Sequence, residues 1–74
     1  MTLADFVRWR VTVEGVTRGA VIDHQIARSG VSRETIYACA TGRRPMRQIE
    51  KARAVARATR GACSVAELCW EDRR

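Results

Sequence analysis

Four glycines divide this chain into short segments, and this division limits the possible folds more than any other feature. Glycine adopts the left-handed backbone conformation that commonly ends a helix. Hydroxyl side chains, which are good helix N-caps, stand near the start of the segments. The glycines are Gly15, Gly30, Gly42 and Gly61, and the hydroxyl residues are Thr2, Thr17, Ser32 and Ser64. We therefore expect residues 1–74 to form a single all-α domain of four to five helices.

The first segment, residues 1–16, carries two competing patterns. Thr2 followed by Asp5 is an acidic variant of the capping box, and Leu3 and Phe6 then fall on one face of a helix. From residue 7 to residue 13, however, apolar β-branched residues alternate with polar ones, which is the period of a strand. We expect a helix here and keep a strand over residues 7–13 as the alternative.

The second segment, residues 17–42, contains two helices joined by a short turn. The first helix lies between residues 17 and 29, with either Thr17 or Asp23 as its N-cap. Gly30 ends it, and Ser32 caps a further helix that runs through Thr41. Two helices joined by so short a glycine turn cross steeply, as in a helix-turn-helix.

The remaining chain predicts a fourth helix over residues 45–60 and a short helix and tail over residues 64–74. Pro45 suits the first turn of the fourth helix, and Ser64 with Glu67 forms a capping box for the last one. The fourth helix is amphipathic. Its apolar arc holds Ile49, Ala52, Val55, Ala56 and Thr59, and its charged arc, which we expect to be mostly a solvated face, holds Arg47, Glu50, Lys51, Arg53 and Arg57.

Positive charge is concentrated in the middle of the chain. The formal net charge is +6, from 14 Lys plus Arg against 8 Asp plus Glu. Residues 28–60 alone hold nine cations and two carboxylates, a net charge of +7, whereas residues 1–27 are neutral overall. Such a distribution favours a polyanionic partner bound by the middle segment. A GC-rich genome is the alternative reason that 13 of the 14 cations are Arg.

Several functional classes are not expected. A chain this small leaves little room for a deep, water-excluding pocket, so we expect neither an enzyme nor a small-molecule ligand or cofactor. Cys39, Cys63 and Cys69 lack metal-ligand spacing and have only His24 as a nitrogen partner, so we expect reduced thiols and no metal. No stretch approaches the length of a membrane span, and we expect a cytoplasmic protein.

The segment from Ile26 to Pro45 resembles the helix-turn-helix of Cro/CI-type phage repressors. It contains Gly30-Val31-Ser32, then Ile36, and ends in Gly42-Arg43-Arg44-Pro45. The residues that follow, through Leu68, are similar to the C-terminal half of small Cro-like and YdaS-type regulators. The resemblance covers roughly two thirds of the chain, residues 23–68. It implies a lambda-repressor-like bundle whose third helix, starting at Ser32, enters the major groove of an operator.

The resemblance also implies roles for individual residues. The outward positions of the third helix contact base edges, and residues around it contact phosphates. The base-contacting set is Arg33, Glu34, Tyr37 and Ala38, and the phosphate-contacting set is Gln25, Ser32, Thr35, Arg43, Arg44 and Arg47. Two alternatives stay open: Glu34 as a partner of the helix dipole, and Tyr37 as ordinary packing.

One departure from the family pattern concerns the second helix. The family places three residues between a packed alanine and the turn glycine, whereas Ala27 and Gly30 leave only two. Either Ile26 takes the place of the alanine or the turn is distorted.

The resemblance implies a phage or prophage repressor that binds an inverted repeat as a homodimer in the nucleoid of a bacterial or phage-infected cell. Leu68 and Trp70 are candidates for the dimer interface, with core packing as the alternative for Trp70. The alternative function is a protein-interaction module, such as an antitoxin or antirepressor, on the same helical scaffold.

Overall fold

A computed structural model of the chain describes residues 1–70, and in this range the chain forms five helices and no strand. They are α1 (Leu3–Glu14), α2 (Arg18–Ser29), α3 (Arg33–Ala40), α4 (Ile49–Ala58) and α5 (Val65–Leu68). The prediction of an all-α chain is confirmed. Residues 7–13 are helical throughout, so the strand alternative is wrong, and the predicted tail at 71–74 lies outside the described residues.

The helix ends are set by local hydrogen bonds. Thr2 and Thr17 each accept a backbone N–H at 3.1 Å, from Asp5 and Ala20 respectively, so Thr17 and not Asp23 is the N-cap of α2. Ser64 and Glu67 form the complete capping box, with both bonds between 3.0 and 3.1 Å. These bonds satisfy backbone donors that have no partner inside a helix.

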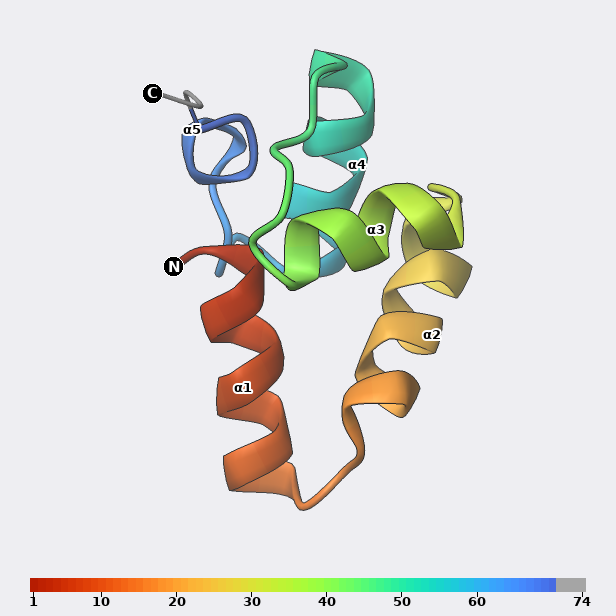
Figure 1. Cartoon of the computed structure of the whole chain (residues 1–74), viewed down its shortest axis with the longest axis vertical. Coiled ribbons are helices and arrows are strands. Elements are labelled where there is room, and N and C mark those ends of the chain that lie inside the picture. The colour runs from red at the N-terminus through yellow and green to blue at the C-terminus, as the bar shows by residue number, and fades with distance from the viewer. Residues whose placement is uncertain (71–74) are drawn as a thin grey trace.

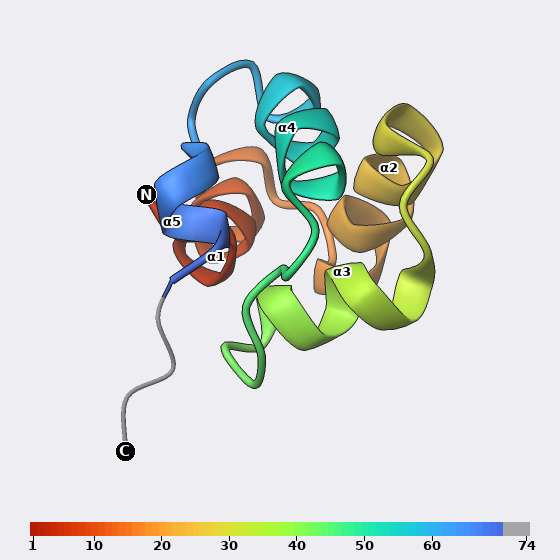
Figure 2. The same cartoon turned by 90° about the horizontal axis from the view of Figure 1, so that it is seen from above.

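α2 is the central element of the bundle. It packs against α1, α3 and α4, and α5 packs against α4. In Figure 1, α1 and α2 run as two arms joined by the turn after Glu14, and α3 crosses between them at the other end. Figure 2 shows α3 lying along one side of the bundle, with α1 and α5 grouped away from α2.

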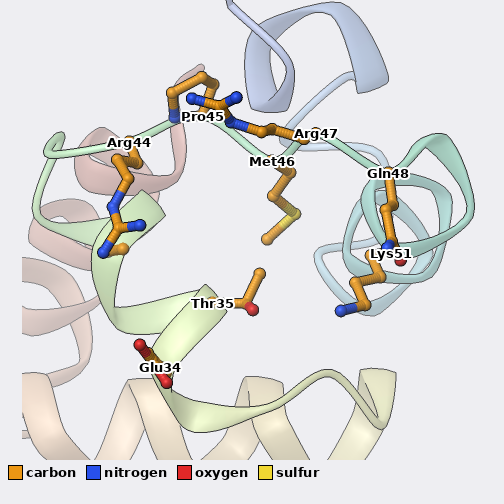
Figure 3. A pocket seen from close by; sticks show the side chains of 9 residues that line it. Glu34, Thr35, Arg44, Pro45, Met46, Arg47, Gln48 and Lys51 are labelled. Atoms are coloured by element: carbon orange, nitrogen blue, oxygen red, sulfur yellow. The ribbon is translucent and has the colours of Figure 1, made fainter.

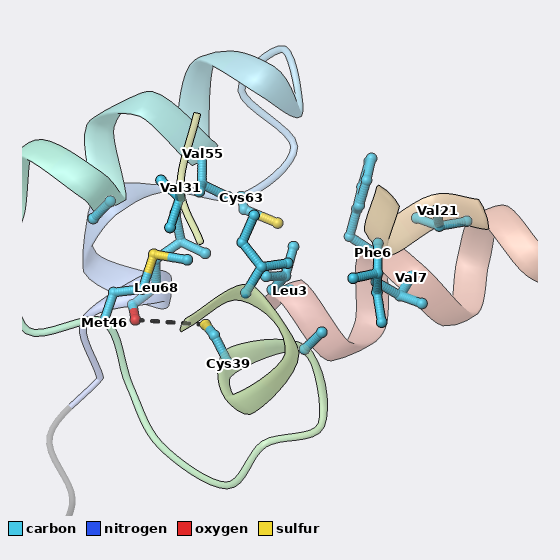
Figure 4. Close-up of a cluster of buried hydrophobic side chains, with 14 residues drawn as sticks. Leu3, Phe6, Val7, Val21, Val31, Cys39, Met46, Val55, Cys63 and Leu68 are labelled. Atoms are coloured by element: carbon cyan, nitrogen blue, oxygen red, sulfur yellow. Dashed lines mark hydrogen bonds between the residues drawn. The ribbon is translucent and has the colours of Figure 1, made fainter. Parts of the chain in front are cut away.

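The five helices and three connecting segments contribute buried side chains to one core (Figure 4). Its fully covered members are Leu3, Ile36, Ala52, Val55, Cys63 and Leu68. The Cys39 Sγ faces the Leu68 backbone oxygen at 3.9 Å, as the dashed line in Figure 4 marks. Burial raises the pKa of both the Cys39 and the Cys63 thiol to about 11. Both thiols therefore stay protonated at neutral pH and behave as small apolar side chains.

The fourth helix starts later than its sequence pattern indicates. Pro45 lies in the connecting loop, which stays non-helical through Gln48, whose backbone is extended, and α4 begins at Ile49. The reason is a tertiary contact: Met46 is buried, and its N–H donates to the Leu68 backbone oxygen at 2.8 Å. This bond and the burial of Met46 hold the loop against α5.

Ile49 is a second correction on the same helix. The helical wheel places it on the apolar arc, yet 57% of its surface is exposed. As the first residue of α4 it lies beyond the reach of the core, whereas Ala52, Val55 and Thr59 on the same arc are buried as predicted.

The amino terminus and α5 are joined directly. The Met1 ammonium group donates to the Ala62 backbone oxygen at 2.8 Å and lies 2.7 Å from the Glu67 carboxylate. Glu67 also accepts the Ser64 N–H of the capping box. These bonds, led by the one from the ammonium group, lower the pKa of Glu67 to about 2.

Candidate nucleic-acid interface

The turn between α2 and α3 fixes which face of α3 is turned outward. Gly30 adopts a positive φ of 72°, and its N–H donates to the Ile26 backbone oxygen at 2.9 Å. The next residue, Val31, is buried, so the turn is held against the core. Ile26 is partly buried and packs on the core, whereas Ala27 is exposed. The turn is therefore not distorted: Gly30 is an ordinary left-handed C-cap, and Ile26, not Ala27, is the side chain of this turn that packs on the core.

Ser32 begins α3 as expected from the sequence. Its hydroxyl accepts the Thr35 N–H at 3.4 Å and donates to the Thr35 hydroxyl at 3.0 Å. Glu34 follows in the first turn, where a carboxylate interacts favourably with the helix dipole. Ile36, Cys39 and Ala40 point into the core, which leaves the opposite side of α3 facing solvent.

The outward face of α3 carries the side chains predicted to contact bases. Arg33, Glu34 and Tyr37 are exposed, and Ala38, one turn after Glu34, is half-buried. Tyr37 keeps 45% of its surface exposed, so it is not a packed core residue. Arg33 forms an ion pair with Asp23 of α2, through its Nη2 and the Asp23 Oδ1. One exposed helix face thus presents a guanidinium, a carboxylate, a phenol and a small methyl group.

The loop after α3 places cations beside this face. The Arg43 and Arg44 backbone N–H groups both donate to the Ala38 oxygen, at 2.9 and 3.2 Å, and so close the end of α3. Arg43, Arg44 and Arg47 are all exposed. Within residues 1–70, none of the three has a carboxylate within 4.0 Å. Their charges are therefore not neutralised by neighbouring side chains of the described chain.

A hollow of about 210 Å³ separates α3 from the loop and the start of α4. Thr35 and Ala38 line it from α3. Met46 lies opposite Thr35 in Figure 3. Lys51, on the first turn of α4, extends its ammonium group toward the same space in Figure 3. The sequence pattern predicts that Lys51 lies on the solvated face of the fourth helix, and nothing in that pattern indicates its position beside α3. The hollow gives the surface a concave edge of mainly positive charge.

Two predicted contact residues are corrected by their burial. Gln25 is only 1% exposed, so its side chain is not presented to a phosphate. Leu68 is fully buried in the core and cannot contribute to a dimer interface. Trp70 is partly buried and packs against the core, the alternative considered for it. Gln25 and Leu68 each lie on the inward side of a helix. The sequence pattern of a short helix, or of one with uncertain bounds, does not define which side faces inward.

Two further side chains of α2, His24 and Asp23, contact side chains of neighbouring helices. The His24 Nδ1 lies 3.0 Å from the Arg10 Nη1 of α1, and Arg10 in turn bonds to Glu14 at 2.7 and 2.9 Å. From the sequence, Asp23 is expected only as a possible N-cap of the second helix. Because Asp23 and Arg33 are ten residues apart on different helices, no local spacing rule connects them.

None of the helices in residues 1–70 has the length and apolar character to cross a bilayer. Nor does this range contain a cluster of three or more His, Cys, Asp or Glu side chains able to hold a metal ion. Comparisons of the chain with protein-family models, with curated proteins and with solved structures found no match.

Proposed function

We propose that this chain is a sequence-specific double-stranded DNA-binding regulator that inserts α3 into the major groove. The observation that carries the proposal is the exposed face of α3, with its hydrogen-bonding side chains, beside Arg43, Arg44 and Arg47, which have no carboxylate within 4.0 Å among residues 1–70. A helix of this kind fits the major groove, where base edges present distinct patterns of donors and acceptors. Exposed arginines beside it supply the phosphate contacts that most of the affinity requires.

Within this proposal the arginines have two different roles, base recognition and phosphate binding. Arg33 donates from its guanidinium to guanine O6 and N7, and Glu34 accepts from cytosine N4. Arg43, Arg44 and Arg47 bind phosphates and set the register without choosing the sequence. The regulator is a repressor of the phage or prophage type that the sequence resembles. It acts by occupying a promoter.

The operator follows from the geometry of two copies on one face of the duplex. Their α3 helices enter successive major grooves, about 34 Å apart, so the operator is an inverted repeat with half-sites spaced by one helical turn. The described chain measures 33 × 25 × 21 Å, a size that lets two copies sit side by side at this spacing.

Selection of bound duplexes from a random pool, followed by titration of two variants, tests the proposal. Arg33→Ala should reduce discrimination at one base pair by about 5- to 150-fold, which corresponds to 1–3 kcal/mol, while affinity for unrelated DNA changes little. Arg44→Ala should weaken binding to all sequences similarly and lower the salt slope by about one.

Arg57→Ala is the matched control for both variants. It removes one exposed guanidinium in the last turn of α4, which does not line the hollow beside α3. It should leave the discrimination among base pairs unchanged. It should also leave the salt slope nearly unchanged, because salt screens long-range effects of a surface charge. Absence of sequence preference at physiological salt would refute the proposal and would favour the protein-interaction alternative. Equal effects of Arg33→Ala and Arg44→Ala would refute the division of roles.

A further inference from the structure

We infer that Asp23 is a specificity-determining residue, which positions the Arg33 guanidinium for base recognition from a different helix. The inference rests on the proposed function. Its structural basis is the ion pair between the Asp23 Oδ1 on α2 and the Arg33 Nη2 at the first position of α3.

The ion pair contributes little to folding. The side chains of Arg33 and Asp23 are 65% and 59% exposed, and pairs in such surroundings contribute between zero and about 1 kcal/mol to stability. The effect of the pair is therefore mainly geometric. A free arginine at a helix start samples many rotamers, whereas this one is held by a carboxylate on the neighbouring helix.

The contact leaves most of the guanidinium available. Arginine has five N–H donors, and the pair involves only the Nη2 atom. Nη2 carries two N–H groups, and the ion pair takes one of them. The other, with the Nε–H or an Nη1 N–H beside it, remains to form two parallel bonds to a guanine edge. Fixing the side chain before binding removes about 0.5–1.5 kcal/mol of ordering cost, which corresponds to a 2- to 12-fold change in affinity.

The Asp23 carboxylate also has an electrostatic effect, which lowers the affinity for DNA. A negative charge beside the DNA-facing helix repels phosphates, so Asp23 weakens binding to every sequence. Asp23 therefore raises the preference for the correct base pair at the expense of total affinity. This combination separates it from the phosphate-binding arginines, which raise affinity without preference.

Asp23→Asn tests the inference against operator and single-substitution duplexes from the selection above. We expect discrimination at the base pair of Arg33 to fall about 2- to 12-fold, and affinity for unrelated DNA to rise. In an Arg33→Ala background the same substitution should leave discrimination unchanged, because Asp23 acts only through Arg33. An equal loss of discrimination in that background would overturn the inference.

Asp5→Asn is the matched control. Asp5 is also an exposed aspartate paired with an arginine, Arg8 at 3.6 Å, but it lies on α1 and its removal changes the net charge equally. If Asp23→Asn and Asp5→Asn gave the same binding profile, Asp23 would act through charge alone and the positioning role would be wrong.

A measurement without DNA separates this inference from the proposed function. Nitrogen-15 relaxation of the Arg33 Nε–Hε group should show an ordered side chain in the wild type and a mobile one in Asp23→Asn. Equal mobility in both would overturn the positioning role even if the protein binds DNA specifically. If the wild type had no sequence preference, both proposals would fail. If Arg33→Ala removed the preference and Asp23→Asn did not, only this inference would fail.

Discussion

Replacing Gln25 by methionine should make the protein more stable. Gln25 is a buried residue of α2 that borders a hollow of about 390 Å³ between α1, α2 and the end of α4. Its side-chain amide is buried, and neither the nitrogen nor the oxygen has a hydrogen-bond partner among the described residues. A buried polar group without a partner costs about 1–3 kcal/mol relative to its solvated state.

Methionine has nearly the same length and volume as glutamine but no group that requires a hydrogen bond. We therefore expect Gln25→Met to raise the free energy of unfolding by about 1–3 kcal/mol. In a domain of this size each kcal/mol raises the Tm by about 4–8 °C. Urea unfolding followed by tryptophan fluorescence measures the free energy, and an unchanged m-value shows that the same surface is exposed on unfolding.

Gln48→Met is the matched control for this substitution. Gln48 is exposed at the N-cap of α4 and its side chain makes no capping bond, so the change should stay within about 0.5 kcal/mol of zero. A Gln25→Met protein that is no more stable than the wild type would refute the reasoning. The same variant should bind DNA as the wild type does. A salt slope reduced by one would instead restore the phosphate role of Gln25.

Two further predictions concern the turn at Gly30 and the capping box at Glu67. Gly30→Ala should lower the free energy of unfolding by about 1–2 kcal/mol, because φ is +72° there and the added Cβ meets no atom within 4 Å, so the cost is purely that of the backbone. Gly19→Ala is the control for this substitution. Gly19 lies within α2, and an added Cβ there also meets no atom within 4 Å, so the change should raise the free energy of unfolding by about 0.5–1 kcal/mol. A lower free energy of unfolding in both variants would contradict the argument. Because the pKa of Glu67 is lowered from 4.5 to about 2 in the folded protein, its contribution is complete above pH 4.5 and is lost as the pH falls toward 2. Glu67→Gln should therefore flatten the pH dependence of stability in that window, and parallel wild-type and variant curves between pH 2 and 5 would contradict the assignment.

Features encoded within a few residues of each other were predictable from the sequence. The caps at Thr2, Ser32 and Ser64 and the end of α2 at Gly30 all depend on bonds that span at most four residues. Once α3 begins at Ser32, the side on which Arg33, Glu34 and Tyr37 lie follows from helix geometry alone. This is why the predicted base-contacting residues share an exposed face.

Features that depend on contacts between distant segments were decided only by the tertiary structure. α4 begins at Ile49 and not at Pro45, and the loop before it is held by the burial of Met46 and its bond to the backbone of α5, more than twenty residues away. The burial of Gln25 and Leu68 depends on which side of each helix its neighbours cover. The pairing of Asp23 with Arg33 depends on the crossing of α2 and α3. Local hydrogen bonds thus let the sequence determine where most helices begin and end, whereas the packing of those helices decided which side chains remain available to a partner.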